Sequence, residues 1–66
     1  MPVHNKLKEL RHDYRMNQTE FAEFLGISVH QYNRYEKGAS QPSLEVALKI
    51  SDKVGRTVNE LFQARP

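Results

Sequence analysis

Two stretches of helical pattern meet at a glycine within the segment NQTEFAEFLGISVHQYNRYEKG. Asn17 and Glu20 stand three residues apart ahead of an apolar run, which is the spacing of a capping box at a helix start. Gly26 can take the positive φ that ends a helix, and Ser28 with Gln31 repeats the capping signal two residues later. A short turn containing glycine favours helices that cross at about 90–120°. The segment therefore predicts a helical corner whose second helix protrudes.

Helical patterns also flank this corner. Apolar residues at three- and four-residue spacing predict a first helix over residues 4–14. Ser43 can cap a fourth helix over residues 44–54, whose apolar set is so wide that most of it is expected to be enclosed by neighbours. Thr57 and Glu60 form another capping box and open a short fifth helix. The fold class expected is all-α with five helices, and only MPV and FQA at the two ends offer weak support for a small ribbon.

Length and composition limit the chain to one domain over residues 1–66, because so short a chain can bury only one small core. It has no cysteine, so neither disulfides nor thiolate zinc sites can supplement that core. The longest apolar runs are a few residues, which predicts a cytoplasmic protein without a membrane span. The net charge of +2 suits a polyanion but does not decide for one.

The residues offer little support for catalysis or for a bound cofactor. His4, His12 and His30 lack the spacing of metal ligands. No pair of carboxylates and no nucleophile beside a base stands out. The chain is therefore expected not to be an enzyme, and neither a metal nor a cofactor is expected.

Four stretches carry a wider resemblance: KELR, NQTEFAEFLGIS, YEKG, and PSLEVALKI followed by VNELF. Together they resemble the lambda-repressor-like Cro/CI (XRE) helix-turn-helix family over residues 5–62. The resemblance implies a compact five-helix DNA-binding domain of bacterial, archaeal or phage type. It also implies a transcriptional repressor that binds an inverted-repeat, double-stranded operator as a homodimer, with its third helix in the major groove.

The base-reading residues are expected on the third helix. Positions 29, 30, 33 and 34 share the face opposite two tyrosines, at 32 and 35, that stand where the family usually has aliphatic residues. Arg34 can donate two hydrogen bonds to guanine O6 and N7. Val29 can pack on a thymine methyl group or be a partly buried helix-start residue, and His30 and Asn33 can reach either bases or phosphates.

Phosphate contacts are expected from polar side chains around the corner, namely Asn17, Gln18, Gln31, Lys37 and Ser40. Gln18 resembles the family's phosphate-gripping residue at the start of the second helix, and its alternative is a solvated first-turn residue. The resemblance also pairs Arg11 with Glu36 in a partly buried salt bridge. The alternative for Arg11 is a phosphate contact.

A dimer surface is expected near the end of the chain, from Val58, Leu61 and Phe62, although one or two of these must also close the core. The competing function is a protein-interaction module, such as an antitoxin that masks a partner protein, with DNA binding secondary. Phe24, at a position commonly polar in the family, favours this alternative if it is not simply folded over its own helix. Arg34, Lys37 and Gln18 favour the DNA reader.

Overall fold

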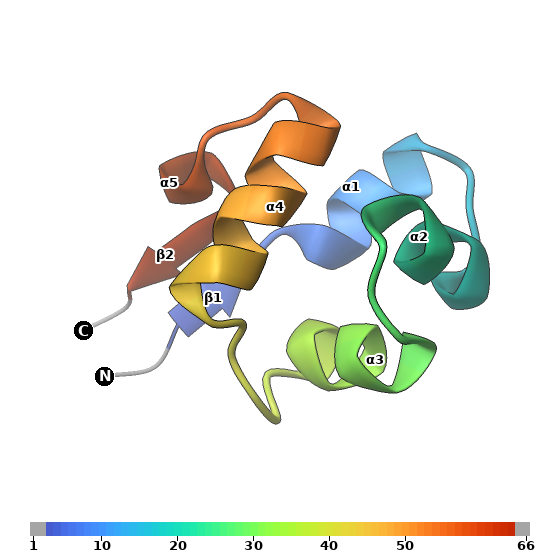
Figure 1. Cartoon of the computed structure of the whole chain (residues 1–66), viewed down its shortest axis with the longest axis horizontal. Coiled ribbons are helices and arrows are strands. Elements are labelled where there is room, and N and C mark those ends of the chain that lie inside the picture. Colours follow the sequence, from blue (N-terminus) through green and yellow to red (C-terminus); the bar gives the residue numbers. More distant parts are fainter. Residues whose placement is uncertain (1–2, 65–66) are drawn as a thin grey trace.

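The computed structural model describes residues 3–64, which form five helices and a two-stranded ribbon (Figure 1). The five predicted helices are confirmed. The elements in chain order are β1 (Val3–Asn5), α1 (Leu7–Asp13), α2 (Gln18–Leu25), α3 (Val29–Lys37), α4 (Leu44–Val54), α5 (Val58–Leu61) and β2 (Phe62–Ala64).

The first helix begins three residues later than predicted, because the residues before it pair with the C-terminal strand. β1 and β2 are antiparallel, with Val3 opposite Ala64. The Asn5 side chain then accepts a hydrogen bond from the Leu7 amide at 3.1 Å, which satisfies a donor at the start of α1. Of the predicted MPV strand only Val3 takes part, and Met1 and Pro2 lie outside the described residues.

The corner between α2 and α3 has the predicted caps, with one difference. The Asn17 side chain accepts from the Glu20 amide at 2.8 Å, and the Glu20 carboxylate accepts from the Asn17 amide at 2.9 Å. Gly26 ends α2 with a φ of 77°. The Ser28 hydroxyl accepts from the Gln31 amide, but the reciprocal bond of a capping box is not formed in the described structure. Ser28 alone therefore caps the protruding helix.

The core is built from the inner faces of the helices. Its fully buried side chains include Tyr32, which projects inward from α3 as predicted, and Tyr35 of the same helix is 6% exposed. The Tyr32 ring meets Phe21 edge to face, and its hydroxyl donates to the Leu7 carbonyl oxygen at 3.3 Å. Both tyrosines thus fix α3 against α1 and α2, and the opposite face of α3 is left outward.

The prediction that neighbours enclose most of α4 is wrong. Only Ala47 and Ile50 of this helix are buried, whereas Leu44 is 72% exposed and Leu48 is 53% exposed. α4 packs against α2 and α5 along one stripe, so its other side has no covering element within residues 3–64. Two leucines one turn apart are therefore left on the surface.

Phe24 is half-buried within an aromatic cluster of its own domain. Its ring stacks on Phe21 with centroids 6.0 Å apart and lies 5.3 Å from the ring of Tyr14. The ammonium group of Lys53 lies 5.7 Å above the same ring, a cation–π contact. These contacts confirm that Phe24 is folded over its own helix.

Candidate nucleic-acid interface

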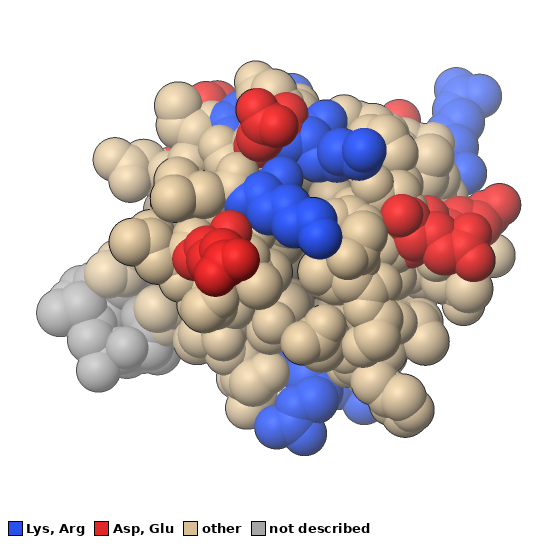
Figure 2. All heavy atoms as spheres, in the orientation of Figure 1, with Lys and Arg blue, Asp and Glu red and all other residues tan. Residues whose placement is uncertain are grey.

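The outward face of α3 carries basic and polar side chains. His30, Gln31, Arg34 and Lys37 are exposed there. The one carboxylate within Val29–Lys37 belongs to Glu36, which is turned away from this face and paired with Arg11. In Figure 2 the charged side chains at the lower edge, over α3, are basic, and the acidic ones lie higher, over α4 and beside α2. The face can therefore approach a polyanion without local repulsion.

The other residues expected to contact bases or phosphates lie around this face with different exposures. Val29 is exposed in the first turn of α3, next to its Ser28 cap. Asn33 is half-buried because it lies on the side of α3 that faces α2. Ser40 is half-buried in the turn that follows α3, whereas Asn17 is exposed at the start of α2. Of these residues Asn33 contacts the start of α2, through its hydrogen bond to Gln18.

The start of α2 provides amide groups for an anion. Its cap occupies the amide of Glu20, while the amides of Gln18 and Thr19 have no intrahelical partner in the first turn of a helix. The helix dipole adds a partial positive charge at this position. Since α2 and α3 pack together, this pair of amides adjoins the outward face of α3. Such an arrangement suits a phosphate oxygen.

The predicted Arg11–Glu36 pair is present and forms a two-pronged contact. Arg11 Nε donates to Glu36 Oε2 at 3.0 Å, and Arg11 Nη2 donates to Glu36 Oε1 at 3.2 Å. The two side chains are only 14% and 8% exposed. A third donor, Nη1, reaches the Met16 carbonyl oxygen at 3.2 Å. The guanidinium group of Arg11 is therefore committed within the domain, which leaves it a structural role.

The Glu36 carboxylate is kept charged by these contacts. Its burial acts to raise its pKa, but the hydrogen bonds from its neighbours, led by that from Arg11, outweigh burial, so that the pKa lies below the usual value. In Tyr32 the opposite occurs, because burial raises the pKa of its hydroxyl. A charged carboxylate with a neutral phenol is thus the stable arrangement beneath α3.

Acid should therefore destabilise the protein in part through Glu36. Its pKa is lower in the folded than in the unfolded chain, so its contribution to stability is present above the unfolded value and is lost as the pH falls through the folded value. Urea unfolding measured between about pH 7 and about pH 3 should show the stability falling below about pH 4.5. In Glu36→Gln the fall should be smaller, and an equal fall in both proteins would assign it to other carboxylates.

A side-chain contact between the two helices of the corner was not predicted from the sequence. Gln18 Nε2 donates to Glu36 Oε1 at 3.1 Å, and Gln18 Oε1 accepts from Asn33 Nδ2 at 2.9 Å. Likewise Asn5 Nδ2 donates to the Tyr35 carbonyl oxygen at 2.8 Å and so joins β1 to α3. Asn5 was predicted to lie inside the first helix, so its sequence position did not indicate this contact.

Of the three residues expected to form a dimer surface, one is withdrawn into the core. Leu61 is only 1% exposed and belongs to the buried cluster. Val58 and Phe62 are half-buried, and Phe62 packs against that cluster. The end of the chain therefore offers less apolar surface than the sequence suggested, because most of it closes the domain.

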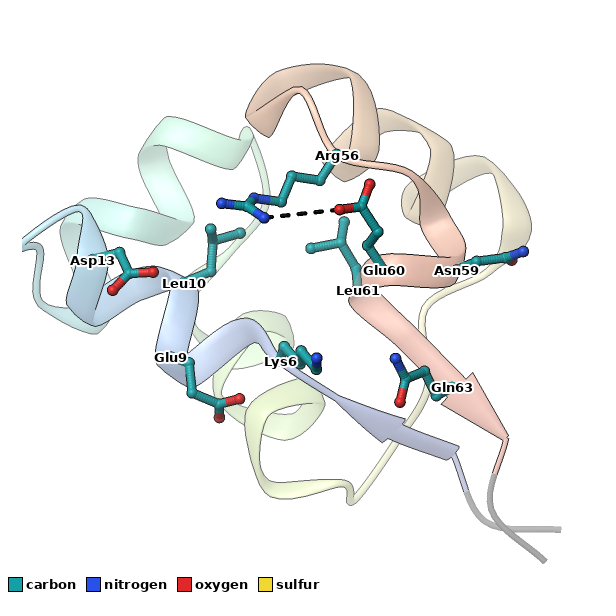
Figure 3. A pocket seen from close by; sticks show the side chains of 9 residues that line it. All are labelled: Lys6, Glu9, Leu10, Asp13, Arg56, Asn59, Glu60, Leu61 and Gln63. Atoms are coloured by element: carbon teal, nitrogen blue, oxygen red, sulfur yellow. Dashed lines mark ion pairs between the residues drawn. The ribbon is translucent and has the colours of Figure 1, made fainter.

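A hollow of about 330 Å³ lies between α1 and α5 (Figure 3). Both acidic and basic side chains line it, and Arg56 pairs with Glu60 at 3.8 Å. Its lining contains neither serine nor histidine. The full lining is Lys6, Glu9, Leu10, Asp13, Arg56, Asn59, Glu60, Leu61 and Gln63.

Two further properties hold for residues 3–64. Their helices are too short and too polar to cross a bilayer. Their histidine and carboxylate side chains do not gather in groups of three that could hold a metal ion.

Comparison with known proteins agrees with this architecture. The helix-turn-helix sequence profile HTH_3 matches residues 7–61. The transcriptional repressor RstR of the cryptic phage CTXphi, from Vibrio cholerae, is 35% identical over 57 residues, which cover 86% of this chain and 51% of RstR. An uncharacterized HTH-type transcriptional regulator of Methanocaldococcus jannaschii is 36% identical over 58 residues, which cover 88% of each chain.

Longer archaeal relatives share the domain only. An HTH-type transcriptional regulatory protein of Pyrococcus horikoshii is 51% identical over 47 residues, or 71% of this chain. The match covers 15% of that protein, so the chain corresponds to a small part of it. The profile match, the capped corner and the outward basic helix agree, and the chain belongs to the Cro/CI-type (XRE) helix-turn-helix family.

Proposed function

We propose that the protein is a sequence-specific, double-stranded DNA-binding transcriptional regulator, acting as a repressor in the cytoplasm. The observation that carries the proposal is the outward face of α3, where exposed Arg34 and Lys37 stand free while Glu36 is withdrawn into its pair with Arg11. Helix α3 would lie in the major groove, which is wide enough for a helix. Repression is supported by the name of the relative RstR.

The roles of individual residues follow from their positions. Arg34, exposed in the middle of the face, would read a guanine, and His30 and Val29 would meet bases nearer the start of α3. Gln18 and the free amides beside it would hold a phosphate, and Lys37 would contact the backbone farther along. Further backbone contacts would come from Asn17, Gln31 and Ser40.

The protein would bind as a homodimer, and the exposed leucines of α4 support a surface different from the C-terminal one. Leu44 and Leu48 lie one turn apart, so in a two-fold arrangement Leu44 of each copy can face Leu48 of the other. Glu45 is exposed beside Leu44, whereas Lys49 donates to the Gly26 carbonyl oxygen at 3.1 Å. The first turn of α4 follows the loop of residues 38–43 that comes from the end of α3, so the axis would lie on that side of the molecule (Figure 1).

The area available suggests a dimer that assembles on DNA. Two leucines per copy provide much less than the roughly 800 Å² per partner of a stable interface. We therefore expect Leu48→Ser to weaken binding to a duplex with two half-sites and to leave binding to one half-site unchanged. Gel-shift titrations with both duplexes measure this, with exposed Asp52→Ser as the control. Equal affinity of Leu48→Ser and the wild type for the two-site duplex would contradict this surface.

Selection of bound duplexes from random DNA tests the function itself. We expect an inverted repeat, whose half-sites are centred about one helical turn apart. Affinity for it should fall with salt along a log–log slope of about −0.9 per phosphate neutralised. Failure to enrich any sequence, or an affinity independent of salt, would refute the proposal.

Such a failure would favour the alternative function, a protein-interaction module that masks a partner protein. The residue that suggested it, Phe24, is already packed against Tyr14 and Lys53 of its own domain.

A further inference from the structure

A continuous row of side-chain hydrogen bonds connects the last turn of α1 to the outward face of α3, called the reading face below. It begins at Arg11, passes through Glu36 and then Gln18, and ends at Asn33. The donor–acceptor distances of the three bonds lie between 2.9 and 3.2 Å, within the usual range for N–H···O hydrogen bonds. The row links the buried ion pair to a residue on the edge of the reading face.

The charge of Glu36 fixes the direction of every bond in this row. A carboxylate can only accept, so Gln18 must turn its NH₂ group toward Glu36 and its carbonyl oxygen away. That oxygen in turn can only accept, so Asn33 must turn its NH₂ group toward Gln18. Reversing either amide would set oxygen against oxygen in a half-buried place. The orientation of the Asn33 amide is therefore determined by a charge two residues away in the row.

Asn33 retains one donor and one acceptor in this orientation. An amide NH₂ group has two N–H bonds, of which Gln18 takes one. When Gln18 accepts from the N–H on the Cβ side, the remaining N–H and the carbonyl oxygen form the outer edge of the amide. Asn33 is only half-buried, so this edge can meet a ligand that enters along α3.

One base in the major groove presents the complement of this pair. Adenine offers an acceptor at N7 beside a donor at N6, whereas guanine offers two acceptors, cytosine a donor alone and thymine an acceptor alone. We infer that Asn33 reads adenine through N6 and N7, and that Gln18 and Glu36 are positioning residues that hold its amide in the reading orientation. The inference rests on the proposed function and predicts one base, an adenine, in each half-site.

The test begins with duplex selection on the wild type and on Asn33→Ala. The expected result is one adenine per half-site that the wild type requires and Asn33→Ala does not. At that position, 7-deazaadenine, which lacks N7, and purine, which lacks the N6 amino group, should each weaken wild-type binding by about 5-fold or more and leave Asn33→Ala unaffected.

The outcomes separate this inference from the function it rests on. Enrichment of an inverted repeat in which no adenine depends on Asn33 overturns the adenine reading and leaves the DNA-binding proposal standing. No enrichment at all overturns both. Wild-type binding that tolerates both base analogues also overturns the adenine reading.

The role of the row is tested with Glu36→Gln. A neutral amide at this position can donate as well as accept, so Gln18 and Asn33 are free to reverse. The preference for adenine over guanine at the Asn33 position should fall by about 5-fold or more, while preferences elsewhere in the half-site remain. Ile50→Val, a core change outside the row, is the control for lost stability, with both variants assayed where circular dichroism shows them folded. An unchanged adenine preference in Glu36→Gln, or an equal loss in Ile50→Val, overturns the positioning role.

Discussion

Glu36→Ala is expected to lower the free energy of unfolding by about 3–5 kcal/mol, a large share of the stability of so small a domain. The Arg11 side chain is only 14% exposed in the wild type, and the change would remove its counter-charge. It also removes the acceptor of Gln18 Nε2. Urea unfolding followed by circular dichroism measures the effect as a lower midpoint with an unchanged slope.

A surface ion pair provides the matched control. Arg56 and Glu60 are 3.8 Å apart and 53% exposed each, so Arg56→Ala should change the stability by no more than about 0.5–1 kcal/mol. If Glu36→Ala costs no more than Arg56→Ala, the buried pair does not stabilise the fold in the way its geometry indicates.

Arg34→Ala is expected to reduce discrimination between the selected operator and a mismatched one by about 1–3 kcal/mol, or about 5–150-fold. Arg34 is exposed, and its loss would remove two hydrogen bonds to one guanine without disturbing the core. Competition binding with duplexes changed at single positions measures the effect. The melting temperature should stay within experimental error of the wild type.

Lys37→Ala is the comparison for this result, because Lys37 is an exposed cation one turn farther along α3. It should weaken binding to all duplexes alike and reduce the salt slope by about one unit. A loss for Arg34→Ala that is equally uniform would assign Arg34 to the phosphate backbone.

The ends of the helices could be predicted from the sequence because they depend on local chemistry. Asn17, Ser28 and Thr57 each accept from an amide three residues on, as their types and spacing indicated. Gly26 and Gly55 take the left-handed conformation that ends a helix. The predicted start of α1 was wrong because it depends on contacts that are distant in the sequence. β1 pairs with residues at the other end of the chain.

The surface of α4 could not be predicted from its composition. A wide apolar set is equally compatible with a helix surrounded by neighbours and with one that packs along a single stripe. Which of these holds depends on the number of elements that reach the helix, and in this domain they leave Leu44 and Leu48 uncovered. The apolar pattern therefore did not reveal the two exposed leucines, and the dimer surface expected at Val58, Leu61 and Phe62 stays a prediction.

The exposure of the basic side chains on α3 could be predicted from the sequence, but the contacts within the candidate site could not. The positions of Arg34 and Lys37 on an outward face follow from the inward tyrosines and helical spacing. The contact of Gln18 with Asn33 depends instead on the distance and angle between α2 and α3. Fractions of an ångström decide such a bond, and spacing in the sequence does not contain them.

The ribbon of β1 and β2 affects the order in which the domain folds. Its register sets Val3 opposite Ala64, so it closes a loop that contains nearly the entire chain. Loop closure costs entropy that grows with loop length, whereas the helical corner depends on contacts close in sequence. The helices are therefore expected to assemble first and the ribbon to close last. In the native protein the ribbon amides should then exchange with solvent through a local opening that leaves the helices folded.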